Sequence, residues 1–257
     1  MNDIVYQERL RLVDDLGALL ALWHERDGTA EIPILGDSLD SGLGIHNLVE
    51  HVANLSESIR LLVANDMSLP IVPLIRLSME SCITAAWWAG DPSRVRYSAA
   101  EEVRQKLLLA DDLAASGPDP LAHAEIGGAL RDHAERLGSP TEDAKVFKAR
   151  CSSTPGFGWA YTQYRLLSLY SHAGTALVAE YTNPADTHVG VSIDQRPTWS
   201  AQSAGFGIQV VLLTIALSVY DALLPLRPMR AALQRFADSR EFVDLVDAVV
   251  NGIAARG

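Results

Sequence analysis

The chain is organised around one stretch, residues 159–174, which reads WAYTQYRLLSLYSHAG. An α-helix turns by about 100° per residue, so a helix here would carry Tyr161, Arg165, Ser168 and His172 along one stripe. The two ionisable side chains, Arg165 and His172, would then lie two turns apart, about 10 Å along the helix axis. The sequence therefore predicts one helix that combines core packing with a line of polar groups.

Further helices, separated by proline and glycine breaks, account for most of the chain. Apolar residues recur at three- and four-residue steps over roughly residues 3–26, 45–65, 70–89, 93–116, 121–137, 142–148, 157–181, 200–224, 227–237 and 240–255. We expect the three most apolar segments, 71–89, 157–181 and 200–224, to be central. Strand-like alternation is confined to residues 187–198. The pattern predicts an all-α, multi-helix bundle of about eight to ten helices with at most one short hairpin near 187–198.

Length and composition are those of a folded protein. The chain has 257 residues, of which 48% are hydrophobic and 21% are charged, and this balance argues against disorder over most of the chain. Such a length fits one large helical domain or two small ones. We expect a single helical domain over residues 1–257, with the more polar helices of residues 92–149 as a peripheral helical appendage.

The net charge of −11 limits the classes of partner. It argues against a broad basic surface for duplex DNA or for a membrane of anionic lipids, although a small basic cleft is compatible with it. Residues 205–226 are the most membrane-like, but Gln209, Asp221 and Pro225 interrupt them, so we expect a buried central helix. The N-terminus has no signal-peptide pattern, and two cysteines are too few for a disulfide framework. A cytoplasmic location is therefore expected.

A second helix carries ions of its own. Arg76 and Glu80 stand four residues apart within an apolar segment, where a charge is costly unless it has a partner. They can pair with each other across one helical turn, and they can also face Arg165 and His172. Two interpretations stay open: a polar network that fixes how helices pack, or a functional cluster.

These residues also carry a family resemblance. Arg76 and Glu80 on one helix, followed by YRLLS at residues 164–168 and by His172, resemble a bacterial all-helical family. That family is similar to the HEPN superfamily, whose active members carry an Arg followed a few residues later by a His. Arg165 and His172 have six residues between them, and Leu166 stands where a polar residue is usual in the superfamily. The resemblance covers roughly residues 45–182.

The resemblance implies an activity and a partner. Active HEPN proteins pair this helix across a homodimer and cut RNA without a metal. By that resemblance, His172 would handle the proton of the attacking 2′-hydroxyl group and Arg165 would hold phosphate. The residue types suit this chemistry, because histidine titrates near neutral pH and guanidinium groups grip phosphate. We expect the supporting residues to be Arg76, Glu80, Tyr161, Tyr164, Ser168 and Trp87.

Two other classes of function fit the same residues. The chain can be a small-molecule enzyme or binding protein whose pocket lies between the central helices, near Arg76, Glu80 and the tryptophans. It can also be a non-catalytic interaction protein in which these groups form a satisfied polar network. The first alternative predicts an intramolecular cavity, whereas the second predicts complete hydrogen bonding and no cavity.

A metal site is not expected. His46 and Glu50 would share a helix face at four-residue spacing, but His51 would lie about 140° from His46 around the axis. The three side chains therefore cannot easily bind one ion, and the spacing matches no zinc-protease motif. Cys82 and Cys151 also lack metal-ligand spacing, so we expect neither a metal nor another cofactor.

Overall fold

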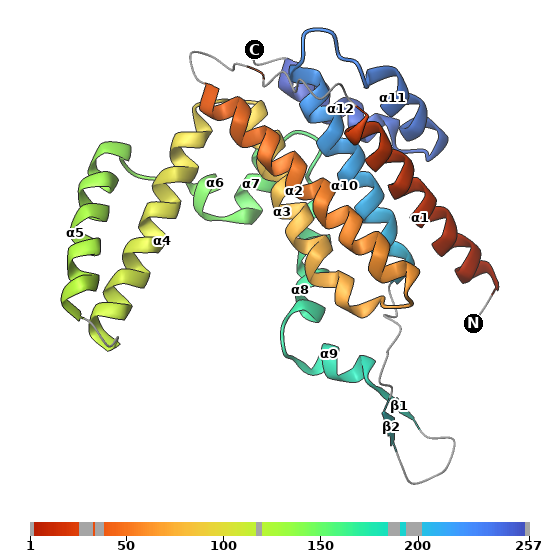
Figure 1. The fold of residues 1–257 in the computed structure, drawn as a ribbon, viewed down its shortest axis with the longest axis horizontal. Coiled ribbons are helices and arrows are strands. Elements are labelled where there is room, and N and C mark those ends of the chain that lie inside the picture. Colours follow the sequence, from red (N-terminus) through yellow and green to blue (C-terminus); the bar gives the residue numbers. More distant parts are fainter. Residues whose placement is uncertain are drawn as a thin grey trace.

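The protein is an all-α bundle, as the sequence predicts (Figure 1). The computed structural model describes residues 3–25, 33, 39–116, 120–184, 191–193 and 202–254. Within these residues the elements, in chain order, are α1 Asp3–His24, α2 Leu39–Ala64, η1 Leu69–Ile71, α3 Val72–Ala89, α4 Arg94–Ser116, α5 Pro120–Leu137, α6 Glu142–Lys145, α7 Phe147–Ser153, α8 Ala160–Ser171, α9 Thr175–Glu180, β1 Thr182–Pro184, β2 Val191–Ile193, α10 Gln202–Leu223, α11 Arg230–Ser239 and α12 Val243–Ala254.

Helix α10 is the centre of the core. It packs against α1, α2, α3, α11 and α12 (Figure 1), and every residue from Leu212 to Asp221 is buried. A helix that is apolar on all sides needs neighbours on all sides, which explains the central position expected for this segment. Its one long polar side chain in the middle, Gln209, donates to the hydroxyls of Ser56 on α2 and Ser78 on α3, at 2.7 and 2.9 Å. This bond set ties three core helices together.

Two of the described helical segments are long and apolar enough to cross a membrane. They are Leu69–Ala89, which joins η1 and α3, and Gly205–Leu223 within α10, and the fold buries 61% and 72% of their most apolar windows. Core helices of soluble proteins can have the same length and composition, so these two segments alone do not decide the location of the protein. The cytoplasmic location stays a prediction.

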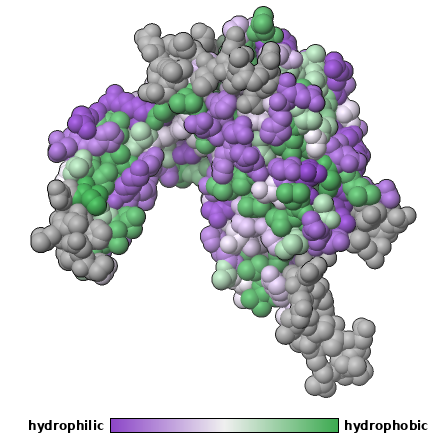
Figure 2. Space-filling view, viewed as in Figure 1, coloured by the Kyte–Doolittle hydropathy of each residue, from purple (hydrophilic) through white to green (hydrophobic). Residues whose placement is uncertain are grey.

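Helices α4 and α5 form a hairpin that projects from the bundle (Figure 1). Arg131 and Asp111 pair across it at 3.2 Å, and Arg96 Nε donates to the carbonyl of Leu137 at 2.9 Å. Figure 2 shows a hollow between this hairpin and the limb that carries α8 and α9. The hairpin lies within the region expected as an appendage, and the division of the chain into domains stays a prediction.

Three segments differ from the sequence expectation. The helix expected over 157–181 is divided into α8 and α9, because the chain is extended at His172 (φ −111°, ψ 151°) and at Gly174. Glycine costs about 1 kcal/mol relative to alanine inside a helix, which makes residue 174 a weak point. Helix α2 begins six residues before the expected 45, and α7 extends to Ser153, into a segment expected to be a loop.

The described residues contain one short pair of strands, which agrees with the expectation of at most one hairpin, but only one of its strands lies within 187–198. The structure pairs β1 with β2 as antiparallel strands, with Thr182 opposite Ile193 and Pro184 opposite Val191. Strand β2 falls inside the expected range of 187–198, whereas β1 precedes it. A three-residue strand that follows directly on a helix carries too few residues for an alternating pattern to be recognised.

Candidate functional site

The two helices expected to face each other, α3 and α8, do pack together. Arg76 Nη2 donates to the Tyr164 hydroxyl at 2.7 Å, and the guanidinium carbon lies 4.8 Å from the centre of the Tyr164 ring. On its other side, Arg76 Nη1 lies 3.3 Å from His172 Nε2. Glu80 completes the group, with its Oε1 3.3 Å from Arg76 Nε. We call these four residues the Arg76 cluster.

Arg76 and Glu80 form a close ion pair rather than an aligned hydrogen bond, because Nε has no hydrogen-bond acceptor although it is shielded from solvent. Burial raises the pKa of the Tyr164 hydroxyl above its usual value. The bond donated by Arg76 opposes this rise in pKa, and the charge and hydrogen bond of Glu80 add to it. Tyr164 therefore stays a neutral phenol that links the guanidinium to the carboxylate.

His172 is the exposed member of the cluster. An arginine side chain can only donate, so the contact of Nη1 with His172 Nε2 requires a lone pair on that nitrogen. A hydrogen bond between these two nitrogens is therefore formed only by the tautomer that carries its proton on Nδ1. The side chains of Arg76 and Glu80 are 25% and 36% exposed, so an incoming ligand can reach the guanidinium as well as the imidazole.

Arg165 is not part of the cluster. The expected stripe fails because α8 ends at Ser171 and His172 is extended, which carries the imidazole away from the line of Arg165 and toward α3. Arg165 is exposed, and it has no hydrogen bond or ion pair with any residue that the structure describes. The guanidinium beside His172 is that of Arg76, which the sequence analysis placed in a supporting position.

The other expected supporting residues fall in three places. Tyr161 lies beside the cluster, with its ring stacked on that of Tyr164 at a centroid distance of 6.3 Å and an interplanar angle of 16°. Ser168 is turned to its own helix and donates to the carbonyl of Tyr164 at 2.8 Å. Trp87 is buried three turns further along α3, where its Nε1 donates to Asp143 at 3.0 Å.

The surroundings of Trp87 form a second polar cluster, which the sequence analysis missed. Arg150 on α7 donates to the Thr84 hydroxyl at 2.9 Å and to the carbonyl of Ala144 at 2.7 Å. Burial lowers the pKa of this guanidinium, against the opposing charge of Asp143. The sequence indicates part of this second cluster. Arg76, Glu80 and Thr84 recur every four residues and so mark one polar face of α3.

Three cavities lined by described residues do not include the Arg76 cluster in their linings. One of them, an open hollow beside α9, begins at Ala173 next to His172 and is lined by Leu177 and Val178. Within the described part of the chain, no group of three His, Cys, Asp or Glu side chains is placed to hold a metal ion. His46 instead packs against the rings of Trp23 and Tyr220, at centroid distances of 5.8 and 5.5 Å.

Comparison with known proteins gives no relative from which a role could be carried over. No protein-family model matches the chain, and neither the curated proteins nor the solved structures contain a match. The functional interpretation therefore rests on the side chains of α3, α7 and α8 themselves.

Proposed function

We propose that this protein is a metal-independent endoribonuclease of the HEPN-like kind, or a degenerate relative of one. In this proposal His172 handles the proton of the attacking 2′-hydroxyl group, and Arg76 rather than Arg165 holds the phosphate. The observation that carries it is the exposed imidazole lying 3.3 Å from a partly exposed guanidinium. A proton-transfer group beside a fixed cation is the minimum that cleavage of a phosphodiester requires.

The reaction needs no outside reactant. The 2′-oxygen attacks the adjacent phosphorus while a base removes its proton, the bond from phosphorus to the 5′-oxygen breaks, and the leaving oxygen takes up a proton. The products end in a 2′,3′-cyclic phosphate and a 5′-hydroxyl group. A phosphate placed against Arg76 would compete for the Nη1 proton now shared with His172, and His172 Nε2 would then be free to accept the proton of the hydroxyl group.

The surface around the cluster suits a single strand better than a duplex. Tyr161 stacks on Tyr164, a member of the cluster, and Lys148 Nζ lies 5.7 Å from the centre of the Tyr161 ring. Exposed Arg165 adds a further cation on α8. Aromatic rings interleaved with cations are the usual means of holding unpaired bases and their backbone. The net charge of −11 works against non-specific binding. The fall of affinity with salt depends on the number of phosphates neutralised, so the few cations near the cluster predict a modest salt dependence.

A homodimer and a cytoplasmic location belong to the same proposal. A second copy beside the exposed face of α8 would double the number of cations that face one RNA strand. Sedimentation velocity at several protein concentrations, with and without RNA, measures whether the protein forms this homodimer.

The direct test is cleavage of a mixed-sequence RNA in the presence of EDTA. We expect the wild-type protein to release 2′,3′-cyclic phosphate ends and a His172→Ala variant to be slower by about a hundredfold or more. Arg76→Lys keeps the charge but not the planar fork, so we expect a loss of similar size for it. Arg165→Ala is the matched control on α8, and we expect it to change binding more than the cleavage rate.

Each result separates the alternatives. Loss of cleavage in Arg165→Ala with full activity in Arg76→Lys would show that Arg165, rather than Arg76, holds the phosphate. Absence of cleavage by the wild-type protein and all variants, with the same melting temperature for each, would reject the proposal that the protein is an endoribonuclease. Absence of cleavage together with a large drop in the melting temperature of Arg76→Lys would identify the cluster as a packing network instead.

A further inference from the structure

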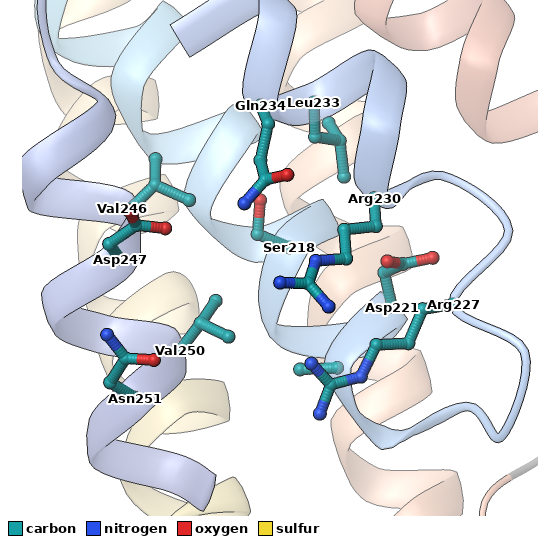
Figure 3. Close-up of a pocket in the computed structure, with 11 residues that line it drawn as sticks. Ser218, Asp221, Arg227, Arg230, Leu233, Gln234, Val246, Asp247, Val250 and Asn251 are labelled. Carbon is teal, nitrogen blue, oxygen red and sulfur yellow. The ribbon is translucent and has the colours of Figure 1, made fainter. Parts of the chain in front are cut away.

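A polar pocket that shares no residue with the Arg76 cluster lies between α10, α11 and α12 (Figure 3). Its cavity volume is about 60 Å³, and its floor includes the apolar side chains of Leu233 and Val246. A water molecule needs about 10–15 Å³ on this measure, so the space holds roughly four to six water-sized groups. The polar residues that line it include Ser218, Asp221, Arg227, Arg230, Asp247 and Asn251.

Two arginines enter the pocket, Arg227 from the turn between α10 and α11 and Arg230 from the first residue of α11. Figure 3 shows the side chains of Arg227 and Arg230 extending side by side toward α12. Among the described residues, neither guanidinium has a hydrogen-bond or ion-pair partner. Arg227 has a positive φ of 44°, which costs a non-glycine residue roughly 1–2 kcal/mol. Backbone bonds from Arg227 N to the Leu224 carbonyl and from Arg230 N to the Arg227 carbonyl, at 3.3 and 3.2 Å, hold this turn in place.

Two aspartates balance the arginines. Asp221 is 3% exposed, and its Oδ1 accepts a bond of 2.7 Å from the backbone N–H of Met229. Burial raises the pKa of this carboxyl group, while the Met229 bond and the two guanidinium charges oppose the rise. Asp247 lies on α12, across the pocket from the arginines, and Asn251 follows one turn later (Figure 3). The formal charges of the lining cancel, with cations on one wall and a carboxylate on the other.

We propose that this pocket binds a free α-amino acid. The ligand carboxylate would meet Arg227 and Arg230, and the ligand ammonium group would meet Asp247 and the side-chain carbonyl of Asn251. The five heavy atoms shared by all α-amino acids match the four to six water-sized groups that the cavity holds. A phosphate alone would satisfy the arginines but would face the like charge of Asp247 across the pocket.

A wider hollow on the other side of Arg227 and Arg230 is lined by Pro225, Leu226 and Pro228, and it shares both arginines and Gln234 with the pocket. Its exposed lining is more polar than apolar, so it gives no preference for an apolar ligand side chain.

Calorimetric titration of the full chain with the twenty amino acids tests the proposal, with acetate, ethylammonium and inorganic phosphate as probes of the separate charges. We expect at least one amino acid to bind, and acetate and ethylammonium each to bind at least about tenfold more weakly, which corresponds to 1.4 kcal/mol. Arg230→Gln and Asp247→Asn should each weaken amino-acid binding by about tenfold or more. Arg235→Gln, on α11 but outside the pocket lining, is the matched control and should leave binding unchanged.

Three outcomes would overturn the proposal. They are absence of binding by every amino acid, binding of phosphate in preference to amino acids, and equal binding by the wild-type protein and Asp247→Asn. Melting temperatures of the variants without ligand identify any variant that fails to fold. The result is independent of RNA cleavage, since the pocket and the Arg76 cluster share no residue.

Discussion

At the scale of single residues, Asp143 shows how neutral donors can hold a carboxylate ionised. Burial acts to raise its pKa, but bonds from the Thr141 hydroxyl at 2.6 Å, the Ser153 hydroxyl at 3.1 Å and Trp87 Nε1 at 3.0 Å outweigh this. The pKa of Asp143 is therefore lower in the folded protein than its ordinary value. The three donors join α3, α6 and α7, so protonation of this one group affects the contact between three helices.

This predicts a dependence of stability on pH. A carboxyl group with a lowered pKa stabilises the fold above its unfolded pKa, about 3.9, and loses that contribution as the pH falls through its folded value. We expect Asp143→Asn to lower the free energy of unfolding at pH 7 by about 1–2 kcal/mol, because its amide group cannot accept all three bonds. The difference in the free energy of unfolding between Asp143→Asn and the wild-type protein should shrink as the pH approaches 3.

Urea unfolding followed by tryptophan fluorescence at pH 7, 5 and 3 measures the effect. Asp112→Asn is a suitable control, because Asp112 is an exposed aspartate on α4 whose side chain has no bond to any described residue. A difference between Asp143→Asn and the wild-type protein that stays constant from pH 7 to pH 3 would contradict the role given to its ionised form.

The candidate site could be predicted from the sequence only where local periodicity determines it. The four-residue spacing of Arg76 and Glu80 within an apolar helix indicated a partnered pair, and the structure pairs them. The sequence also allowed this pair to face His172, and Arg76 does contact His172. The position of Arg165 could not be predicted, because it depended on one continuous helix through residue 174. Arg150 was missed because the short helices α6 and α7 carry too few turns for an apolar face to be recognised.

At the scale of elements, the start of α8 is fixed by close contacts with α12. Gly156 has a φ of +80°, and a Cβ atom there would lie 2.6 Å from Val249 Cγ2. Gly252 on α12 faces Pro155 in the same way, since its Cβ would lie 2.6 Å from that ring. The chain around residues 155–156 therefore lies directly on the surface of α12. Because α8 begins four residues after Gly156, this contact also sets where Tyr161 and Tyr164 stand.

We predict that Gly156→Ala destabilises the protein by about 2–4 kcal/mol, from the left-handed backbone and the contact with Val249 together. Gly158→Ala is a matched control, since a Cβ at that position has no atom within 4 Å, and we expect a change within about 0.5 kcal/mol. Chemical denaturation measures both. Equal stability of the two variants would mean that the segment can move away from α12 without cost.

Element boundaries were predictable where proline and glycine mark them. Pro70 lies just before α3 and Pro73 lies in its first turn, and α3 begins within two residues of the expected position and is capped by Gly90. The division between α8 and α9 also falls at a glycine, Gly174, but the apolar spacing continues on both sides of it and favoured one helix over 157–181. His172 leaves the helix where it contacts Arg76 on α3.

At the scale of the whole molecule, the helices differ in how much of the bundle supports them. Helix α10 is enclosed by five other helices, whereas α4 and α5 pack mainly against each other and project from the body (Figure 1). Buried side chains on α4 are limited to Ala100, Val103 and Ala110. Exposed apolar side chains on the hairpin include Leu108, Leu109, Leu113 and Ile126. The hairpin therefore contributes little buried area to the common core.

We expect the hairpin to open without unfolding of the bundle, since regions with few buried contacts open at lower free energy than the core. In hydrogen exchange followed by mass spectrometry, peptides from α10 should exchange only through global unfolding, with the free energy measured by denaturant. Peptides from α4 and α5 should exchange faster and with a weaker dependence on urea. Equal protection of the hairpin and α10 would mean that another surface covers the exposed leucines. Repeating the measurement at several protein concentrations would show whether that surface belongs to a second copy of the chain, because protection that depends on association rises with concentration.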